Sequence, residues 1–142
     1  MKTLASLMLL AATLLAGTPV RAEQVVRVGG YDVHYVVIGT TFLAPDIAQR
    51  YGIERAKDRA FINITVLRNG VSVAAHIEGI ARDLLERRIA LPFREVKERN
   101  SVYYIASLQF SDQEHWRFEL KVTPAGSKEP LAVKFAQQIY VE

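Results

Sequence analysis

The sequence predicts an all-β protein, specifically an antiparallel immunoglobulin-like β-sandwich of seven or eight strands with one short helix. Three observations support this fold class. Apolar and polar residues alternate along most of the chain, which is typical of strands with one buried face. Polar or glycine-rich breaks separate these runs at short, regular intervals. Only one segment has the residue spacing of a helix.

Residues 1–22 have the features of a cleavable secretory signal. Lys2 supplies the initial positive charge, residues 4–16 are almost entirely apolar, and Val20-Arg21-Ala22 fits the cleavage requirement of signal peptidase. The apolar stretch is too short for a stable membrane span, although an uncleaved N-terminal anchor is the alternative. We therefore expect a periplasmic protein with one domain, residues 23–142, and no stable membrane span after cleavage.

Composition excludes several classes of function. The chain has 142 residues with 18 basic and 15 acidic groups, and loss of Lys2 and Arg21 with the signal leaves 16 against 15. This near-neutral balance gives no electrostatic case for nucleic acid binding. The chain has no cysteine, and both methionines, Met1 and Met8, lie in the signal. Thiol nucleophiles, disulfides, iron–sulfur clusters and methionine-ligated copper are therefore excluded.

The expected strands follow one another along residues 24–141. Gly29-Gly30 separates the first two, Gln24–Val28 and Tyr31–Ile38, and Asn69-Gly70 predicts a further hairpin because both residues tolerate positive φ. Pro92 lies in the run from Ile89 to Phe93 and indicates an edge strand there, since proline has no N–H to donate to a neighbouring strand. The apolar positions of the other six runs are Ile62, Ile64 and Val66; Val71, Val73, Ala75 and Ile77; Ile89, Leu91 and Phe93; Val102, Tyr104, Ala106, Leu108 and Phe110; Trp116, Phe118, Leu120 and Val122; and Leu131, Val133, Phe135, Ile139 and Val141.

The expected helix runs from Pro45 to Tyr51, with proline in its first turn and Gly52 as its stop signal. Ala44 at the cap position is a poor capping residue. We therefore expect the helix to depend on packing by the apolar residues around it, Phe42, Leu43, Ile47 and Tyr51.

Four other residues are interpreted from strand parity. Trp116 is assigned to the core, and Tyr103-Tyr104 is expected to direct one ring to each face of its strand. Asn63 faces away from the main core, between Ile62 and Ile64. We interpret it as a hydrogen-bonded structural asparagine.

The sequence resembles a family of small exported proteins of Gram-negative bacteria, catalogued as domain of unknown function 4426. The resemblance covers essentially the whole mature chain, and Thr41–Lys57 is its most specific part. It implies a periplasmic protein without a known activity and transfers no catalytic residue. Family members often have hydroxyl residues at the positions of Ala44 and Ala56, so no role of such hydroxyls carries over. The matching residues are Tyr35, Thr41-Phe42-Leu43, Pro45, Tyr51-Gly52-Ile53, Arg55, Leu91, Phe93-Arg94-Glu95 and Tyr103-Tyr104.

Catalytic and metal-binding motifs are missing from the sequence. His34, His76 and His115 belong to three different expected strands and share no ligand spacing. No Gly-x-Ser-x-Gly elbow or phosphate-binding glycine loop is present. Glu95 and Glu98 have basic neighbours, which favours solvated ion pairs over acid–base catalysis. We expect no catalytic residue, no metal site and no cofactor.

The prediction is therefore a non-catalytic periplasmic interaction or binding module, whose partner is a periplasmic protein or an envelope component. The alternative is a periplasmic metal-binding protein or an enzyme with a site assembled across strands. Thr40 to Arg59 is the candidate surface, because connections of roughly 20 residues are usually functional or disordered. A solvated charged turn is the competing interpretation of this segment. The candidate binding residues, expected to meet an anionic group, are Arg50, Tyr51, Arg55, Lys57 and Arg59.

Overall fold

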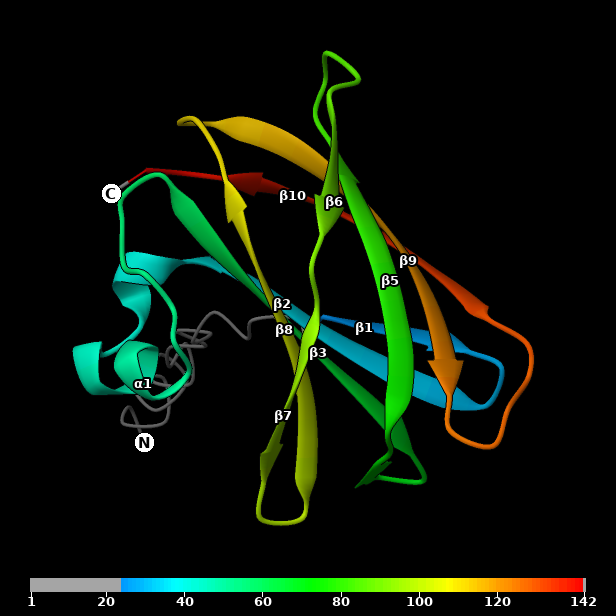
Figure 1. Ribbon diagram of the computed structural model, residues 1–142. Helices are drawn as coiled ribbons and strands as arrows, with labels where there is room; N and C mark the ends of the chain where they lie inside the picture. Colours follow the sequence, from blue (N-terminus) through cyan, green and yellow to red (C-terminus); the bar gives the residue numbers. More distant parts are fainter. Residues whose placement is uncertain (1–23, 142) are drawn as a thin grey trace, which may run out of the picture.

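Two antiparallel sheets packed face to face make up the computed structural model, which describes residues 24–141 (Figure 1). The expected signal peptide lies outside the described residues. One sheet, called sheet A, has the strand order β1-β2-β3-β8-β7 with β4 also paired to β3, and sheet B has the order β10-β9-β5-β6. The predicted sandwich is confirmed. Sheet A contains β1 (Val25–Val28), β2 (Tyr31–Gly39), β3 (Arg59–Arg68), β4 (Val71–Ser72), β7 (Arg94–Glu98) and β8 (Ser101–Gln109), and sheet B contains β5 (Ala75–Arg82), β6 (Arg88–Leu91), β9 (Glu114–Pro124) and β10 (Leu131–Ile139).

Residues 24–141 form ten strands, more than the expected seven or eight, because one predicted run is divided between the two sheets and β7 lies outside every predicted run. The run from Val71 divides into β4 in sheet A and β5 in sheet B. The run containing Pro92 ends at Leu91, and the chain then crosses to β7. Side chains of both sheets point inward with the same period of two, so alternation gives no sign of a crossing. Pro92 lies between β6 and β7, each of which is the edge strand of its sheet, and this agrees with the edge position expected for Pro92.

The two predicted hairpins are present. Asn69 and Gly70 have φ of 50° and 77°, and Gly29 and Gly30 have φ of 56° and 80°. Each pair lies between strands in antiparallel register, with Arg68 opposite Val71 in the first hairpin. These are the positive φ angles that two-residue hairpins require.

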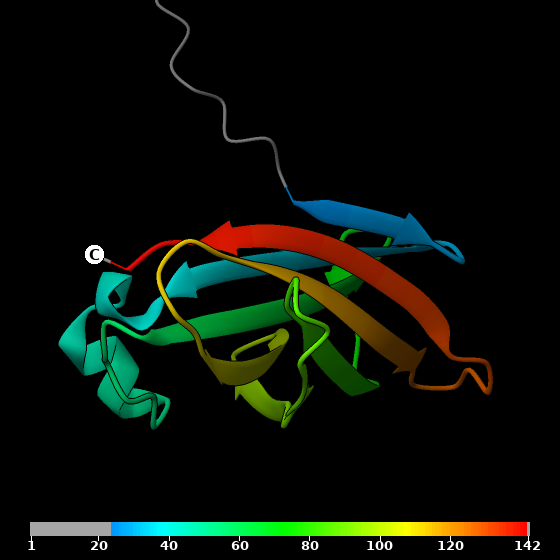
Figure 2. The same ribbon diagram turned by 90° about the horizontal axis from the view of Figure 1, so that it is seen from above.

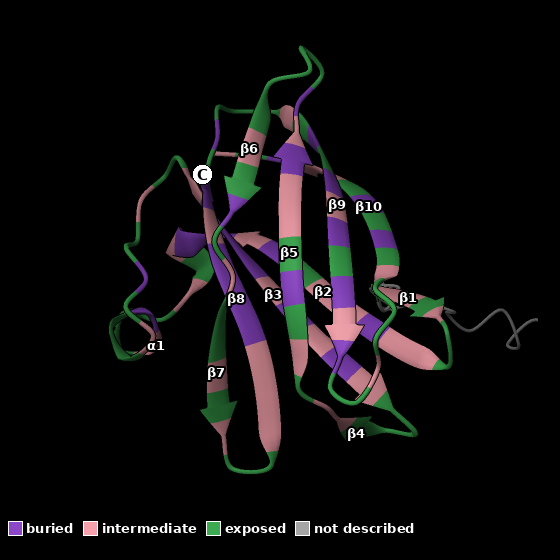
Figure 3. Ribbon diagram, turned by 45° about the vertical axis from the view of Figure 1, so that its right-hand side comes forward, coloured by how far each residue is buried: buried purple, intermediate pink, exposed green. Residues whose placement is uncertain are grey.

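The core between the sheets follows the predicted parity. Buried and exposed residues alternate along β9, with Trp116 and Phe118 fully buried (Figure 3). The ring of Phe118 stacks on Phe135 at 4.9 Å between centroids, and Phe135 stacks on Tyr35 at 3.9 Å. Tyr104 is buried in this core, as one of the two adjacent tyrosines was expected to be.

The connection between β2 and β3 carries the 3-10 turn η1 (Thr40–Phe42) and the helix α1 (Pro45–Arg50), at one end of the sheets (Figure 2). Ala44 provides no side-chain cap, and Ala48 is instead buried in a second apolar cluster with Phe61 and Ile105. The buried hydroxyl of Thr40 fastens the segment internally, because it accepts the N–H of Ala56 at 2.9 Å and donates to its carbonyl oxygen at 3.0 Å.

One packing expectation in this segment is wrong. Phe42 was expected to support the helix, but it is 58% exposed. Its ring lies near Gly39 and lines a hollow with Tyr140, at the ends of β2 and β10. The η1 turn explains the difference, because it directs Phe42 to that hollow while Leu43 packs on the helix cluster.

The turn between β5 and β6 is held by one buried carboxylate. Asp83 accepts the backbone N–H groups of Leu85 and Arg87 at 3.0 and 2.8 Å, and the Arg87 side chain at 2.9 Å. Leu84 and Leu85 are 71% and 90% exposed at the tip of this turn. Within residues 24–141, no helix is long and apolar enough to span a bilayer.

Candidate functional site

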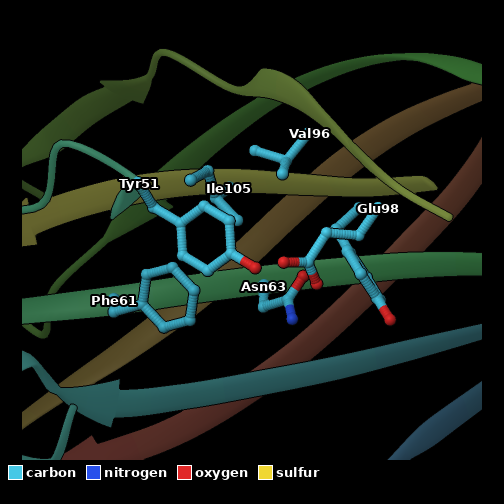
Figure 4. A pocket seen from close by; sticks show the side chains of 7 residues that line it. Tyr51, Phe61, Asn63, Val96, Glu98 and Ile105 are labelled. Atoms are coloured by element: carbon cyan, nitrogen blue, oxygen red, sulfur yellow. The ribbon is translucent and has the colours of Figure 1, made fainter. Parts of the chain in front are cut away.

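A cavity of about 250 Å³ lies on the outer face of sheet A, opposite the core (Figure 4). Strand alternation turns one side chain in two toward this face. Pairing then places Asn63 of β3 opposite Ile105 of β8, and Tyr103 of β8 opposite Val96 of β7. The segment that includes α1 contributes Tyr51 from the side. The lining residues are Tyr51, Phe61, Asn63, Val96, Glu98, Tyr103 and Ile105.

Asn63 supplies a polar group to this largely apolar cavity. Its Oδ1 atom is buried and has no hydrogen-bond partner among the described residues. The interpretation of Asn63 as a hydrogen-bonded structural residue is therefore wrong. A buried acceptor without a donor costs about 1–3 kcal/mol of stability. Such a group calls for an explanation, and a bound water, ion or ligand that brings a donor is one.

Tyr51 and Glu98 form the second polar feature of the cavity. Figure 4 shows the Tyr51 hydroxyl pointing toward the Glu98 carboxylate. The hydrogen bond to Glu98, followed by desolvation, raises the pKa of Tyr51 above its ordinary value of 10.0. The hydroxyl is therefore protonated at neutral pH and donates its proton to the carboxylate.

Arg50 approaches the same carboxylate from outside the cavity. Its Nη1 lies 3.7 Å from Oε1 of Glu98, and the two side chains are 59% and 43% exposed. This distance exceeds a normal N–H···O hydrogen bond, and exposed pairs contribute little to stability. Glu98 thus keeps free acceptor capacity toward the cavity.

The five predicted binding residues are divided by the structure. Tyr51 lines the cavity and contacts Glu98, and Arg50 pairs with the same glutamate. The other three residues do not line the cavity. Arg55 donates to the Thr41 carbonyl oxygen at 3.0 Å, and Arg59 pairs with Glu54 at 3.4 Å. Lys57 is exposed. It has no ion pair with another residue in the range 24–141.

Sequence reasoning missed most of the cavity lining. Asn63 gave a usable signal, since it is a polar residue at an outward position in an otherwise apolar run. Glu98 gave none, because its basic neighbours favoured a solvated ion pair. For Tyr103 and Tyr104, the sequence predicted that one ring is buried and the other lies on the surface, without deciding which.

The three histidines do not form a metal site with one another. His34 lies in sheet A, while His76 and His115 lie near opposite ends of sheet B. His76 pairs with Glu78, at 3.2 Å between Nε2 and Oε1. In the part of the chain that the structure describes, no three histidine, aspartate or glutamate side chains gather in a metal-binding arrangement.

Comparison with known proteins identifies the family. DUF4426, a domain of unknown function, matches residues 25–142. The chain belongs to this family. A crystal structure of a DUF4426 family protein from Pseudomonas aeruginosa PAO1 is 36% identical and superposes with a TM-score of 0.75, covering 84% of this chain and 96% of that one. The predicted family is therefore confirmed.

FetP of uropathogenic Escherichia coli strain F11 shares the fold of this DUF4426 protein. The structure of FetP expressed in the periplasm has 10% identity and a TM-score of 0.63, covering 85% of this chain and 95% of that one. A copper-bound FetP variant has 9% identity and a TM-score of 0.61, covering 85% and 97%. At this identity the likeness concerns the fold alone. No curated protein matches the chain significantly.

Proposed function

We propose that this DUF4426 protein is a non-catalytic periplasmic binding module that receives its partner on the outer face of sheet A. The observation that carries the proposal is the buried, unpartnered Oδ1 of Asn63 in a cavity on that face. The sandwich has its own core on the inner faces of the sheets, so it does not need a polar cavity outside. An acceptor kept there at a cost in stability is explained by a donor that a ligand brings.

The partner that fits this surface is a periplasmic protein or an envelope component. The expected signal peptide supports the location. The cations of the adjoining segment, Arg50, Arg55, Lys57 and Arg59, are proposed to meet anionic groups of the same partner, and Tyr51 to contact it inside the cavity. Lys57 is the most available of these cations, since Arg55 and Arg59 already bind Thr41 and Glu54.

Two variants test the proposal by recovery of crosslinked partners from intact cells. Val96→Trp fills the cavity from an edge strand, and Lys57→Glu reverses the free cation. Lys134→Glu is the matched control, because Lys134 is exposed on sheet B. We expect partner recovery to fall in the first two variants and to persist in the control, at equal melting temperature. Equal recovery from all three proteins would contradict the proposal.

The metal-binding alternative draws on one observation, the copper-bound state of the structurally similar FetP. The histidines of this chain give it no geometric support, since they lie on separate strands. Metal analysis of the purified mature protein decides between the two functions. Stoichiometric zinc or copper, lost on replacing His34, His76 or His115, would establish the alternative.

A further inference from the structure

We propose that the cavity on sheet A binds a primary alkylammonium group, such as the end of a lysine side chain or a small aliphatic amine. This inference rests on the proposed function, because it names the ligand class for the same cavity. Its first support is the balance of polar groups. Asn63 Oδ1 and the Glu98 carboxylate are acceptors, and the Tyr51 hydroxyl uses its proton on Glu98. A ligand that brings donors can therefore serve both the buried Asn63 oxygen and the carboxylate, and an ammonium group carries three.

The walls of the cavity suit a cation at the end of an alkyl chain. The rings of Tyr51, Phe61 and Tyr103 line it, and aromatic faces attract ammonium groups. Val96 and Ile105 supply aliphatic surface for methylene groups. The volume of about 250 Å³ lies below that of drug-sized pockets, so it fits a ligand the size of one side chain.

Charge selects the cation over other ligands of this size. A carboxylate ligand would be repelled by the charge of Glu98 and would leave the Asn63 oxygen without a donor. A neutral alcohol carries one donor and cannot serve both acceptors. Arg50 is the cation that an ammonium group would displace from Glu98, and its loose, exposed contact makes this exchange easy. The released guanidinium would then be free to meet an anionic group of the partner.

The test is a nuclear magnetic resonance titration of the mature protein at neutral pH with n-butylamine, which is then butylammonium. 1-Butanol and butyrate are the neutral and anionic probes of the same length. We expect butylammonium to shift the amide signals of β3, β7 and β8 around the cavity, and to bind at least about tenfold more tightly than 1-butanol, as expected for charge-assisted hydrogen bonds. Butyrate is expected not to bind.

Three variants make the test specific. Glu98→Gln should weaken butylammonium binding at least about tenfold. Arg50→Gln should strengthen it, because a competing cation is removed. Glu78→Gln is the matched control, because Glu78 is exposed on β5 in the other sheet, and it should leave the affinity unchanged. An acetylated, amidated Gly-Lys-Gly peptide separates the two sources: tighter binding than butylamine indicates a protein lysine, and equal or weaker binding indicates a free amine.

The inference and the proposed function can fail separately. Equal binding of 1-butanol and butylammonium, or unchanged affinity in Glu98→Gln, would overturn the ammonium assignment while keeping the cavity as a binding site. If no probe binds but Val96→Trp still abolishes partner recovery, the ammonium assignment is likewise wrong and the cavity is still a binding site. If the Val96→Trp variant still recovers the partner and still binds butylammonium, the proposed function is wrong.

Discussion

Removal of the Phe118 ring is the sharpest test of the core. The side chain is fully buried and stacks on Phe135, which in turn stacks on Tyr35 across the two sheets. Burial of such a side chain contributes about 1.5–3 kcal/mol, and an aromatic pair adds about 0.5–1.5 kcal/mol. With the cavity left behind, Phe118→Ala should lower the free energy of unfolding by about 3–5 kcal/mol.

Urea unfolding monitored by circular dichroism measures this loss. Phe42→Ala is the matched control, since the same substitution there removes a ring that is 58% exposed. The control should change the free energy of unfolding by less than about 1 kcal/mol. A loss below about 1 kcal/mol for Phe118→Ala, the range of ordinary surface changes, would refute the assignment of strand parity.

Three further predictions concern the loops and the N-terminus. Thr40→Val removes both hydrogen bonds to Ala56 and should cost about 1–3 kcal/mol in thermal unfolding; an unchanged melting temperature would contradict this. Burial favours a higher pKa for Asp83, but hydrogen bonds from Arg87 outweigh it and hold the pKa below the ordinary 3.8. The stabilisation by Asp83 is therefore present above pH 3.8 and is lost as the pH falls through the pKa of the folded state. Asp83→Asn should lower the melting temperature at neutral pH, and the melting temperatures of variant and wild type should converge in acid. A difference in melting temperature that stays constant with pH would contradict this. Intact mass of the exported protein should place its N-terminus at Glu23; retention of residues 1–22 would contradict cleavage.

The sandwich could be predicted because its inner faces follow strict alternation. Trp116 and Phe118 point inward as that period requires, and the hairpin at Asn69-Gly70 follows from local backbone preference. The crossings near Val73 and Pro92 could not be predicted, because a strand keeps its inward parity when it leaves one sheet for the other. Local patterns thus determine which face a side chain takes, but not which sheet the strand joins.

The candidate site was accessible to sequence analysis only in part. Arg50 and Tyr51 were found because they lie in an unusually long connection with mixed charge. Asn63, Glu98 and Tyr103 come together through the pairing of β3 with β8 and of β8 with β7, which links residues far apart in sequence. Long-range pairing has no signature in a single sequence, so their common cavity was not foreseen.

Site-specific photo-crosslinking in living cells tests the location of the binding face most directly. A photoreactive phenylalanine analogue is introduced in place of Tyr103, inside the cavity, or in place of Lys121, exposed on sheet B. We predict a light-dependent adduct from the first position that disappears when Val96→Trp is added, and none from the second. Adducts from the second position alone, or adducts from the first that persist in Val96→Trp, would contradict the assignment of the outer face of sheet A as the binding surface.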